Sequence, residues 1–171
     1  EGMGGNDTIT GNGGTQALYL NASAGVTVDL LAGTAQGTDA GDLAGIGTDS
    51  FTGVSGISGS AFDDTLRGSN TTTTVEIFIG NGGNDLIDGR GGNDRVNYAS
   101  ILDDNVTGGI SIDMASGIVM GDASVGTDTL RGIELIRGSQ FADTYVATGF
   151  SGSSTNAGAS GTFNEFEGMG G

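Results

Sequence analysis

Cysteine, proline, histidine and tryptophan are all absent from this chain of 171 residues, and its five basic residues are all arginine. Without cysteine, histidine or lysine there is no thiol nucleophile, no usual zinc ligand set and no general base that titrates near neutral pH. Adjacent acids such as Asp63 and Asp64 could imitate the carboxylate pair of a glycosidase, but neighbouring residues of a strand face opposite sides. We therefore expect no enzymatic activity.

Positive charge is scarce as well. Five basic residues stand against 21 acidic ones, which gives a net charge of −16. Such a field repels nucleic acid and anionic membrane surfaces and attracts cations. The longest apolar stretches, such as Val75–Ile79, are far too short to cross a bilayer. We expect no nucleic-acid partner, no signal peptide and no membrane insertion.

Glycine is abundant instead, with 36 residues, and it is most regular in two nine-residue units, 80–88 and 89–97. In each unit a glycine-rich loop of six residues ends in an aspartate, Asp85 or Asp94, and an apolar residue follows two positions later, Ile87 or Val96. Glycine allows a tight loop to turn its carbonyls towards one point, and Ca²⁺ takes six to eight oxygen ligands. The pattern predicts a metal-binding loop followed by a short strand that fills the core.

These units resemble the calcium-binding nonapeptide repeat of the RTX family, whose repeats form parallel β-helices. The order here is G-x-G-G-N-D, whereas the family has G-G-x-G-x-D; loop length and aspartate position are the same. The resemblance implies an all-β fold, a right-handed parallel β-solenoid (a calcium-binding β-roll) with irregular excursions. It also implies several Ca²⁺ ions, held between loops of successive coils.

Other parts of the chain follow the same spacing less regularly. Residues 2–10 form a full unit, and 11–19 follow in phase but carry Gln16 in the aspartate position, so we expect a weak metal site there. The alternation in 26–30 predicts a half-buried strand. Residues 31–47 are rich in Gly, Ala, Thr and Asp and are interpreted as an excursion from the solenoid. Residues 59–66 form a degenerate unit, and Glu76 takes an aspartate position before Phe78.

The second half of the chain repeats the first. Residues 25–30 match 109–114, residues 47–51 match 126–130, and residues 59–66 match 138–145. Glu76 and Phe78 match Asn164 and Phe166. This duplication predicts one continuous solenoid built of two units, residues 1–79 and 80–171.

The expected calcium ligands are carboxylates at the aspartate positions and carbonyls of the glycine loops. For Asp49 and Asp128 an Asx-turn at the start of a strand explains the residue equally well. The side chains are Asp7, Asp85, Asp94, Asp64, Asp143, Asp49 and Asp128, and the carbonyls are those of Gly2, Gly4, Gly80, Gly82, Gly89 and Gly91. The predicted core comprises Ile9, Leu18, Val28, Leu66, Ile87, Val96, Ile112, Leu130, Tyr145 and Phe166.

The expected function is structural. The chain is interpreted as a calcium-stabilised repeat of a large extracellular bacterial protein, such as a fibre, an adhesin stalk, a surface layer or a biofilm matrix. By resemblance, such proteins leave the cell through type I secretion and fold outside on binding Ca²⁺. Two alternatives stay open: the C-terminal RTX module of a secreted enzyme or toxin, and a carbohydrate-binding module for a surface glycan.

The same five residues, Glu-Gly-Met-Gly-Gly, occur at 1–5 and at 167–171. We therefore expect the chain to be one 166-residue period of a longer array. Successive units would stack head to tail, either along one chain or between subunits.

Overall fold

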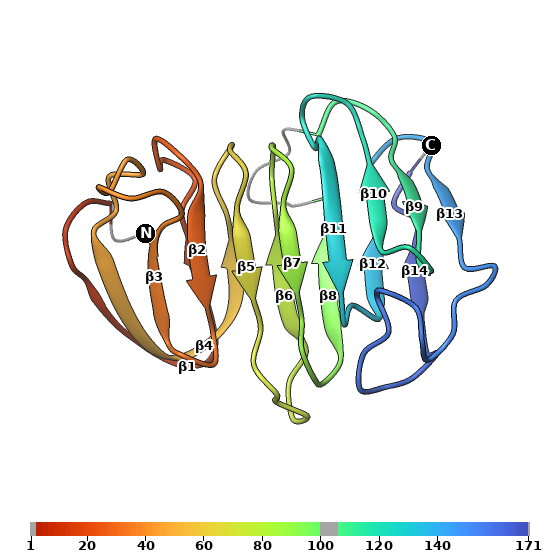
Figure 1. The fold of residues 1–171 in the computed structure, drawn as a ribbon, viewed down its shortest axis with the longest axis horizontal. Helices are drawn as coiled ribbons and strands as arrows, with labels where there is room; N and C mark the ends of the chain where they lie inside the picture. The colour runs from red at the N-terminus through yellow and green to blue at the C-terminus, as the bar shows by residue number, and fades with distance from the viewer. Residues whose placement is uncertain (1–2, 100–105, 171) are drawn as a thin grey trace.

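The computed structural model describes residues 3–99 and 106–170, and this part of the chain is all-β, without a helix. It contains 14 strands (Figure 1). They are β1 (Thr8–Leu18), β2 (Val26–Asp29), β3 (Thr34–Gly37), β4 (Thr48–Ser58), β5 (Thr65–Arg67), β6 (Glu76–Ile79), β7 (Leu86–Asp88), β8 (Asp94–Asn97), β9 (Ser111–Asp113), β10 (Ile118–Met120), β11 (Thr127–Arg131), β12 (Leu135–Arg137), β13 (Thr144–Val146) and β14 (Glu165–Glu167).

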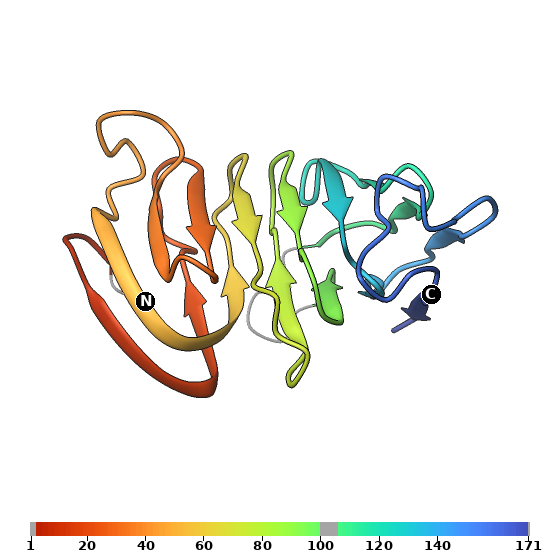
Figure 2. The same cartoon turned by 60° about the horizontal axis from the view of Figure 1, so that its bottom comes forward.

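All 14 strands belong to one sheet, which folds back on itself and is nearly closed (Figures 1 and 2). A first row contains β3, β2, β5, β7, β11, β10, β9 and β13, and a second row contains β6, β8, β12 and β14. The long strands β1 and β4 belong to both rows: β4 pairs with β3 near its start and with β6 near its end. Most of the pairings are parallel, as the sequence predicts.

The core lies between the two rows. Parallel pairing places Leu66, Ile87 and Leu130 in register across the first row. Phe78, Val96 and Ile136 are in register in the same way across the second row. These side chains are at most 1% exposed. Each of these apolar residues lies two positions after an acidic residue. Because alternate residues of a strand face opposite sides, the acidic and the apolar side chain both point inward. Burying each apolar side chain contributes about 1.5–3 kcal/mol.

Most of the predicted core is confirmed. Val28, Leu66, Ile87, Val96, Ile112 and Leu130 are buried, while Ile9, Tyr145 and Phe166 are partly buried against the same cluster. The prediction of Leu18 is wrong. Its neighbours Ala17 and Tyr19 are buried instead, and Leu18 points outward.

The reason is a change of register inside β1. Residues 11–19 do not form a separate loop and strand, because β1 runs on through them and its register against β4 shifts between Thr10 and Thr15 and again before Gln16. Gln16 pairs with Gly56, and Arg95 pairs with Leu135 in the same way in the second half. Gln16 is therefore equivalent to Arg95, which lies 79 residues later in the chain. It follows that Thr15 is the residue equivalent to Asp94. The prediction that Gln16 occupies an aspartate position is wrong by one residue.

Residues 31–47 are not wholly an excursion. They contain β3, which pairs antiparallel with both β2 and β4, and β10 takes the same place between β9 and β11. Each hairpin turns at a glycine in the left-handed region, Gly33 or Gly117, whose N–H bonds back to the carbonyl of Asp29 or Asp113. The sheet is thus parallel with two antiparallel insertions.

The strand pairings occur twice. Val28 pairs with Leu66 as Ile112 pairs with Tyr145, and Ala35 pairs with Asp49 as Val119 pairs with Asp128. Strands β1 to β6 lie in residues 1–79 and β7 to β14 in residues 80–171, and both sets belong to the same sheet.

Candidate metal-binding site

Three buried aspartates are aligned across the first row. Asp64, Asp85 and Asp128 are each at most 2% exposed. One oxygen of each carboxylate accepts the backbone N–H of the equivalent residue on the next strand: Asp85 accepts from Asp64 at 2.8 Å, and Asp128 accepts from Asp85 at 3.0 Å. Asp64 accepts from Val26 at 2.7 Å. We call Asp64, Asp85 and Asp128 the first acidic ladder.

The same arrangement occurs at the other end of the row. Asp49, 1% exposed, accepts the N–H of Asp7 at 3.0 Å. A tyrosine hydroxyl donates to the other oxygen in both halves, from Tyr19 to Asp49 at 3.2 Å and from Tyr98 to Asp128 at 2.8 Å. Asp49 and Asp128 thus bond to neighbouring strands rather than forming Asx-turns.

A second acidic ladder runs along the second row and consists of Glu76, Asp94 and Glu134, all at most 2% exposed. Glu134 accepts the N–H of Asp94 at 3.0 Å, and Glu76 accepts both the N–H and the hydroxyl of Ser69 at 2.7 Å. Glu134 is not among the ligands expected from the sequence. Its position two residues before the buried Ile136, the same spacing as Asp85 and Ile87, is the signal that would have found it.

Five of the six ladder acids, and Asp143, lie against a glycine. The carboxylates of Asp64, Asp85, Asp94 and Asp143 fold back over the first glycine of their own loop, at positions 59, 80, 89 and 138, where a Cβ atom would collide with a carboxylate oxygen. Glu76 lies in the same way over Gly68, and Glu134 over Gly158. The first glycine of the loop therefore makes room for the carboxylate of that loop.

The loops at 80–85 and 89–94 place a side chain at a left-handed backbone position where the RTX repeat that they resemble has glycine. The second loop residue has a left-handed φ, 72° at Asn81 and 64° at Arg90, and the fourth, glycine in both loops, does too. Those are the two positions where the family pattern has glycine besides the first. Here the second position is occupied by a residue with a side chain, for which this conformation is less favourable.

Burial raises the pKa of the ladder carboxylates. The pKa of Asp64 is raised to about 6, chiefly by burial. That of Asp94 is raised to about 8 by burial and by repulsion from Glu76 and Glu134. Burial together with the neighbouring ladder acids raises the pKa of Asp85 strongly, and burial also raises that of Asp128. These groups favour the protonated form, or a cation, over the bare carboxylate.

Among the described residues no arginine forms an ion pair with a ladder acid. The ion pairs there are Arg90–Asp29 at 2.6 Å and Arg137–Glu167 at 2.9 Å, and Arg90 acts on Glu76 only as a nearby charge. Several buried carboxylate oxygens have no hydrogen-bond partner in this part of the chain. They are one oxygen each of Asp7 and Asp85 and both oxygens of Asp94.

These unbonded oxygens fit a hard cation such as Ca²⁺, which binds carboxylate and carbonyl oxygens. No group of three or more acidic side chains converges as a metal site within the described residues. A Ca²⁺ ion would therefore be held by one or two carboxylates, with backbone carbonyls as the other ligands. Loop carbonyls do approach the adjacent loops. The carbonyl of Gly80 faces Gly59, and the carbonyl of Gly89 faces Gly68.

The proposed ligands thus divide into groups. Asp64, Asp85 and Asp128 form the first acidic ladder, and Asp7 and Asp49 form a separate hydrogen-bonded pair. Asp94 lies in the second acidic ladder with Glu76 and Glu134. Asp143 lies apart and bonds to the N–H of Ile110 at 2.9 Å. The atoms nearest to the Cβ positions of Gly4, Gly82 and Gly91 belong to other loops and are not ladder carboxylates. Gly2 lies outside the described residues.

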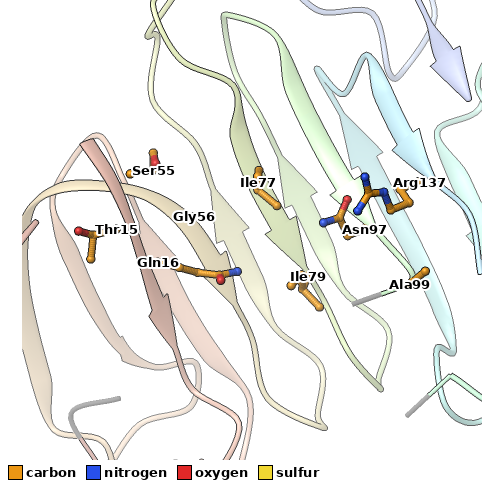
Figure 3. Close-up of a pocket in the computed structure, with 10 residues that line it drawn as sticks. Thr15, Gln16, Ser55, Gly56, Ile77, Ile79, Asn97, Ala99 and Arg137 are labelled. Carbon is orange, nitrogen blue, oxygen red and sulfur yellow. The ribbon is translucent and has the colours of Figure 1, made fainter. Parts of the chain in front are cut away.

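A separate groove lies on the outer face of the second row (Figure 3). Its volume is about 260 Å³, and its lining includes Gly56, Ile77 and Ile79 together with the polar residues Gln16, Asn97 and Arg137. The Arg137 guanidinium is paired with Glu167. This groove is not connected to the acidic ladders, which face the interior.

No protein-family model matches this chain, and a sequence search of curated proteins finds no match either. In the part of the chain that the structure describes, no helix is long and apolar enough to span a membrane. The fold and site therefore define an all-β protein with two buried acidic ladders.

Replacing Gly83 with alanine tests the packing of these loops. Gly83 has a φ of 114°, and a Cβ there would lie 2.5 Å from the carbonyl carbon of Phe62 on the adjacent loop. We expect Gly83→Ala to lower the free energy of unfolding in calcium by more than about 2 kcal/mol. Gly149→Ala is the matched control, because Gly149 also has a left-handed φ, 83°, but nothing lies within 4 Å of its Cβ position. Equal unfolding midpoints for the two variants in urea would contradict the stacked loops.

Proposed function

We propose that this chain is a calcium-stabilised structural repeat of a large extracellular bacterial protein of the RTX kind. Its sheet would be a right-handed parallel β-solenoid, a β-roll, into which two hairpins are inserted. The observation that supports this proposal best is the pair of acidic ladders. They are buried, form no ion pair within the described part of the chain, and carry oxygens beside glycine loops that have no hydrogen-bond partner there.

The energetic argument concerns like charges on adjacent strands. Two carboxylates about 5 Å apart repel each other by roughly 3 kcal/mol at an effective dielectric constant of 20. Burial adds the cost of removing each charge from water. Bound Ca²⁺ would supply positive charge that neutralises these acids, with Asp85, Asp94 and Asp7 as the principal side-chain ligands and Asp64, Asp128 and Asp49 beside them.

This proposal gives the acids a structural role rather than a catalytic one. The ladder carboxylates face a packed core and are closed to a substrate. A chain that needs Ca²⁺ to fold would stay unfolded where calcium is scarce and fold in the millimolar calcium outside the cell. Such behaviour suits export of an unfolded chain by type I secretion and assembly of a fibre, adhesin stalk, surface layer or matrix.

Circular dichroism with and without calcium tests this function. At pH 7.5 in chelator we expect little strand signal, and addition of millimolar Ca²⁺ should restore it cooperatively. Mg²⁺ at the same concentration should be much less effective, because it demands tighter octahedral geometry and gives up its water reluctantly. Identical spectra and thermal midpoints in chelator and in calcium would refute the proposal.

A further inference from the structure

The two halves of the chain meet at a joint inside the molecule. Strands β5 and β6, the last of the first half, pair in parallel with β7 and β8, the first of the second half. Leu66 lies beside Ile87 in one row and Phe78 beside Val96 in the other, and all four side chains are 0% exposed. We call this contact the internal joint.

The equivalents of these strands lie at opposite ends of the molecule (Figure 1). Strand β13 is equivalent to β5, and β14 to β6, because each makes the same pairing within its own half. Strand β1 combines the equivalents of β7 and β8. Among the described strands, β1 pairs with β4 alone, β13 with β9 alone and β14 with β12 alone. The two surfaces that meet in the internal joint thus occur a second time, one at each end of the molecule. There each of them has a strand edge that pairs with no other described strand.

The core is incomplete at both open edges. Ile9, Tyr145 and Phe166 are only partly buried, although their equivalents in the internal joint, Ile87, Leu66 and Phe78, are fully buried. The rings of Tyr145 and Phe166 stack with centroids 4.9 Å apart and form the apolar end of the core. An apolar partner at each end would complete the burial of these side chains.

The internal joint also contains one hydrogen bond between acids of the two halves, in which the carboxylate of Asp85 accepts the backbone N–H of Asp64. The equivalent of Asp85 is Asp7, and both have one buried carboxylate oxygen without a partner among the described residues. The equivalent of Asp64 is Asp143, on the loop that leads into β13 at the opposite end.

We propose that a second copy of this repeat unit docks end to end, with β13 and β14 of one copy paired in parallel with β1 of the next. The register follows from the internal joint: Tyr145 beside Ile9, Phe166 beside Ala17, and the N–H of Asp143 donating to Asp7. The outward pairs would be Thr144 with Thr8, Val146 with Thr10, Glu165 with Gln16 and Glu167 with Leu18. None of these outward pairs opposes two acids. The inward-facing acids Asp143 and Asp7 would lie side by side, as Asp64 and Asp85 do in the internal joint.

This contact is heterologous, since it joins two different surfaces, and it therefore continues into an open row of units. The second copy can belong to the same polypeptide or to a separate molecule. The joint rests on strand edges, apolar side chains and one hydrogen bond. Because it also brings Asp143 beside Asp7, it rests in part on the proposed function, in which Ca²⁺ neutralises such neighbouring acids.

Disulfide cross-linking tests the register, because the chain has no cysteine of its own. Two single variants, Thr10→Cys and Val146→Cys, are mixed and oxidised mildly in calcium. Residues in register on paired strands lie about one strand spacing apart, roughly 4.8 Å. An offset of two residues adds about 6.6 Å along the strand, which places the two residues too far apart for a disulfide. We expect at least about tenfold more heterodimer from this pair than from Thr8→Cys with Val146→Cys.

A tandem chain distinguishes the two sources of the second copy. In it, residue 166 of one copy is followed directly by residue 1 of the next, with Val146→Cys in the first and Thr10→Cys in the second. Cross-linking in the tandem alone would assign the joint to units of one polypeptide, and cross-linking in the mixture would assign it to separate molecules as well. Equal yields from matched and offset cysteines in both experiments, with folding verified by circular dichroism, would overturn the proposal.

Discussion

In the absence of calcium, the chain is expected to be several kcal/mol more stable at about pH 4.5 than at about pH 8.5. Burial raises the folded-state pKa of Asp64 to about 6 and that of Asp94 to about 8, above the value of about 4 for an unfolded aspartate. Protonation therefore favours the folded state. The stabilisation is complete below the unfolded pKa and disappears as the pH rises through the folded pKa values.

The size of the effect follows from the shifts. Asp64 alone contributes roughly 2 kcal/mol between these two pH values at 1.36 kcal/mol per pKa unit, and Asp94 contributes more. The Asp29 carboxyl works in the opposite direction, because its hydrogen bond with Arg90 lowers its pKa. Its contribution is present above the unfolded pKa and is lost only at more acidic pH, so it does not cancel the effect at pH 4.5.

Urea unfolding in chelator at the two pH values measures this difference. The control is the same pair of experiments in saturating calcium, where the cation replaces the proton and the chain should remain folded at pH 8.5. A chelated chain that is equally stable at both pH values, or more stable at pH 8.5, would show that the ladder acids are not the source of its instability.

The second expected result is that Asp85→Asn changes stability with opposite signs in chelator and in calcium. Asparagine keeps the side-chain oxygen that accepts the N–H of Asp64 at 2.8 Å, while the buried charge is removed. Near pH 8 in chelator the variant should be more stable than the parent by roughly 1–3 kcal/mol. In calcium it should lose a charged ligand, and the calcium midpoint of folding should rise about tenfold, equivalent to 1.4 kcal/mol.

Asp39→Asn is the matched control, because Asp39 is exposed and carries the same charge change. It should leave both conditions nearly unchanged. If Asp85→Asn stabilised the chain equally in chelator and in calcium, the residue would be a buried charge without a metal-binding role. A loss of stability in both conditions would contradict the proposal, because it would mean that the carboxylate stabilises the fold without calcium.

Much of the local structure follows from sequence spacing. The acid followed two positions later by an apolar residue predicts a strand whose core side chain points inward, and Ile87 and Val96 follow it. The alternation in Val26–Asp29 likewise predicts β2. These features are local, since side-chain direction alternates along any strand whatever its partner is.

Pairing, by contrast, was decided by the tertiary structure. Ala17 and Tyr19 replace Leu18 in the core because the register of β1 is set by its pairing with β4, some 40 residues away, and a shift of one residue reverses the face of every side chain. The strands β3 and β10 lie in segments without a strong strand pattern and exist because two neighbours accept their hydrogen bonds.

The acidic ladders show the same division. Sequence by itself determined that Asp64, Asp85, Asp94 and Asp128 precede inward-facing apolar residues, and so that their carboxylates point towards the interior. Only the tertiary structure decided that Asp85 lies between Asp64 and Asp128, which are 21 and 43 residues away, and that Asp94 bonds to Glu134, 40 residues away. Side-chain direction is a property of one strand, whereas the neighbours of a buried charge depend on which strands pair, and pairing is settled by the whole sheet.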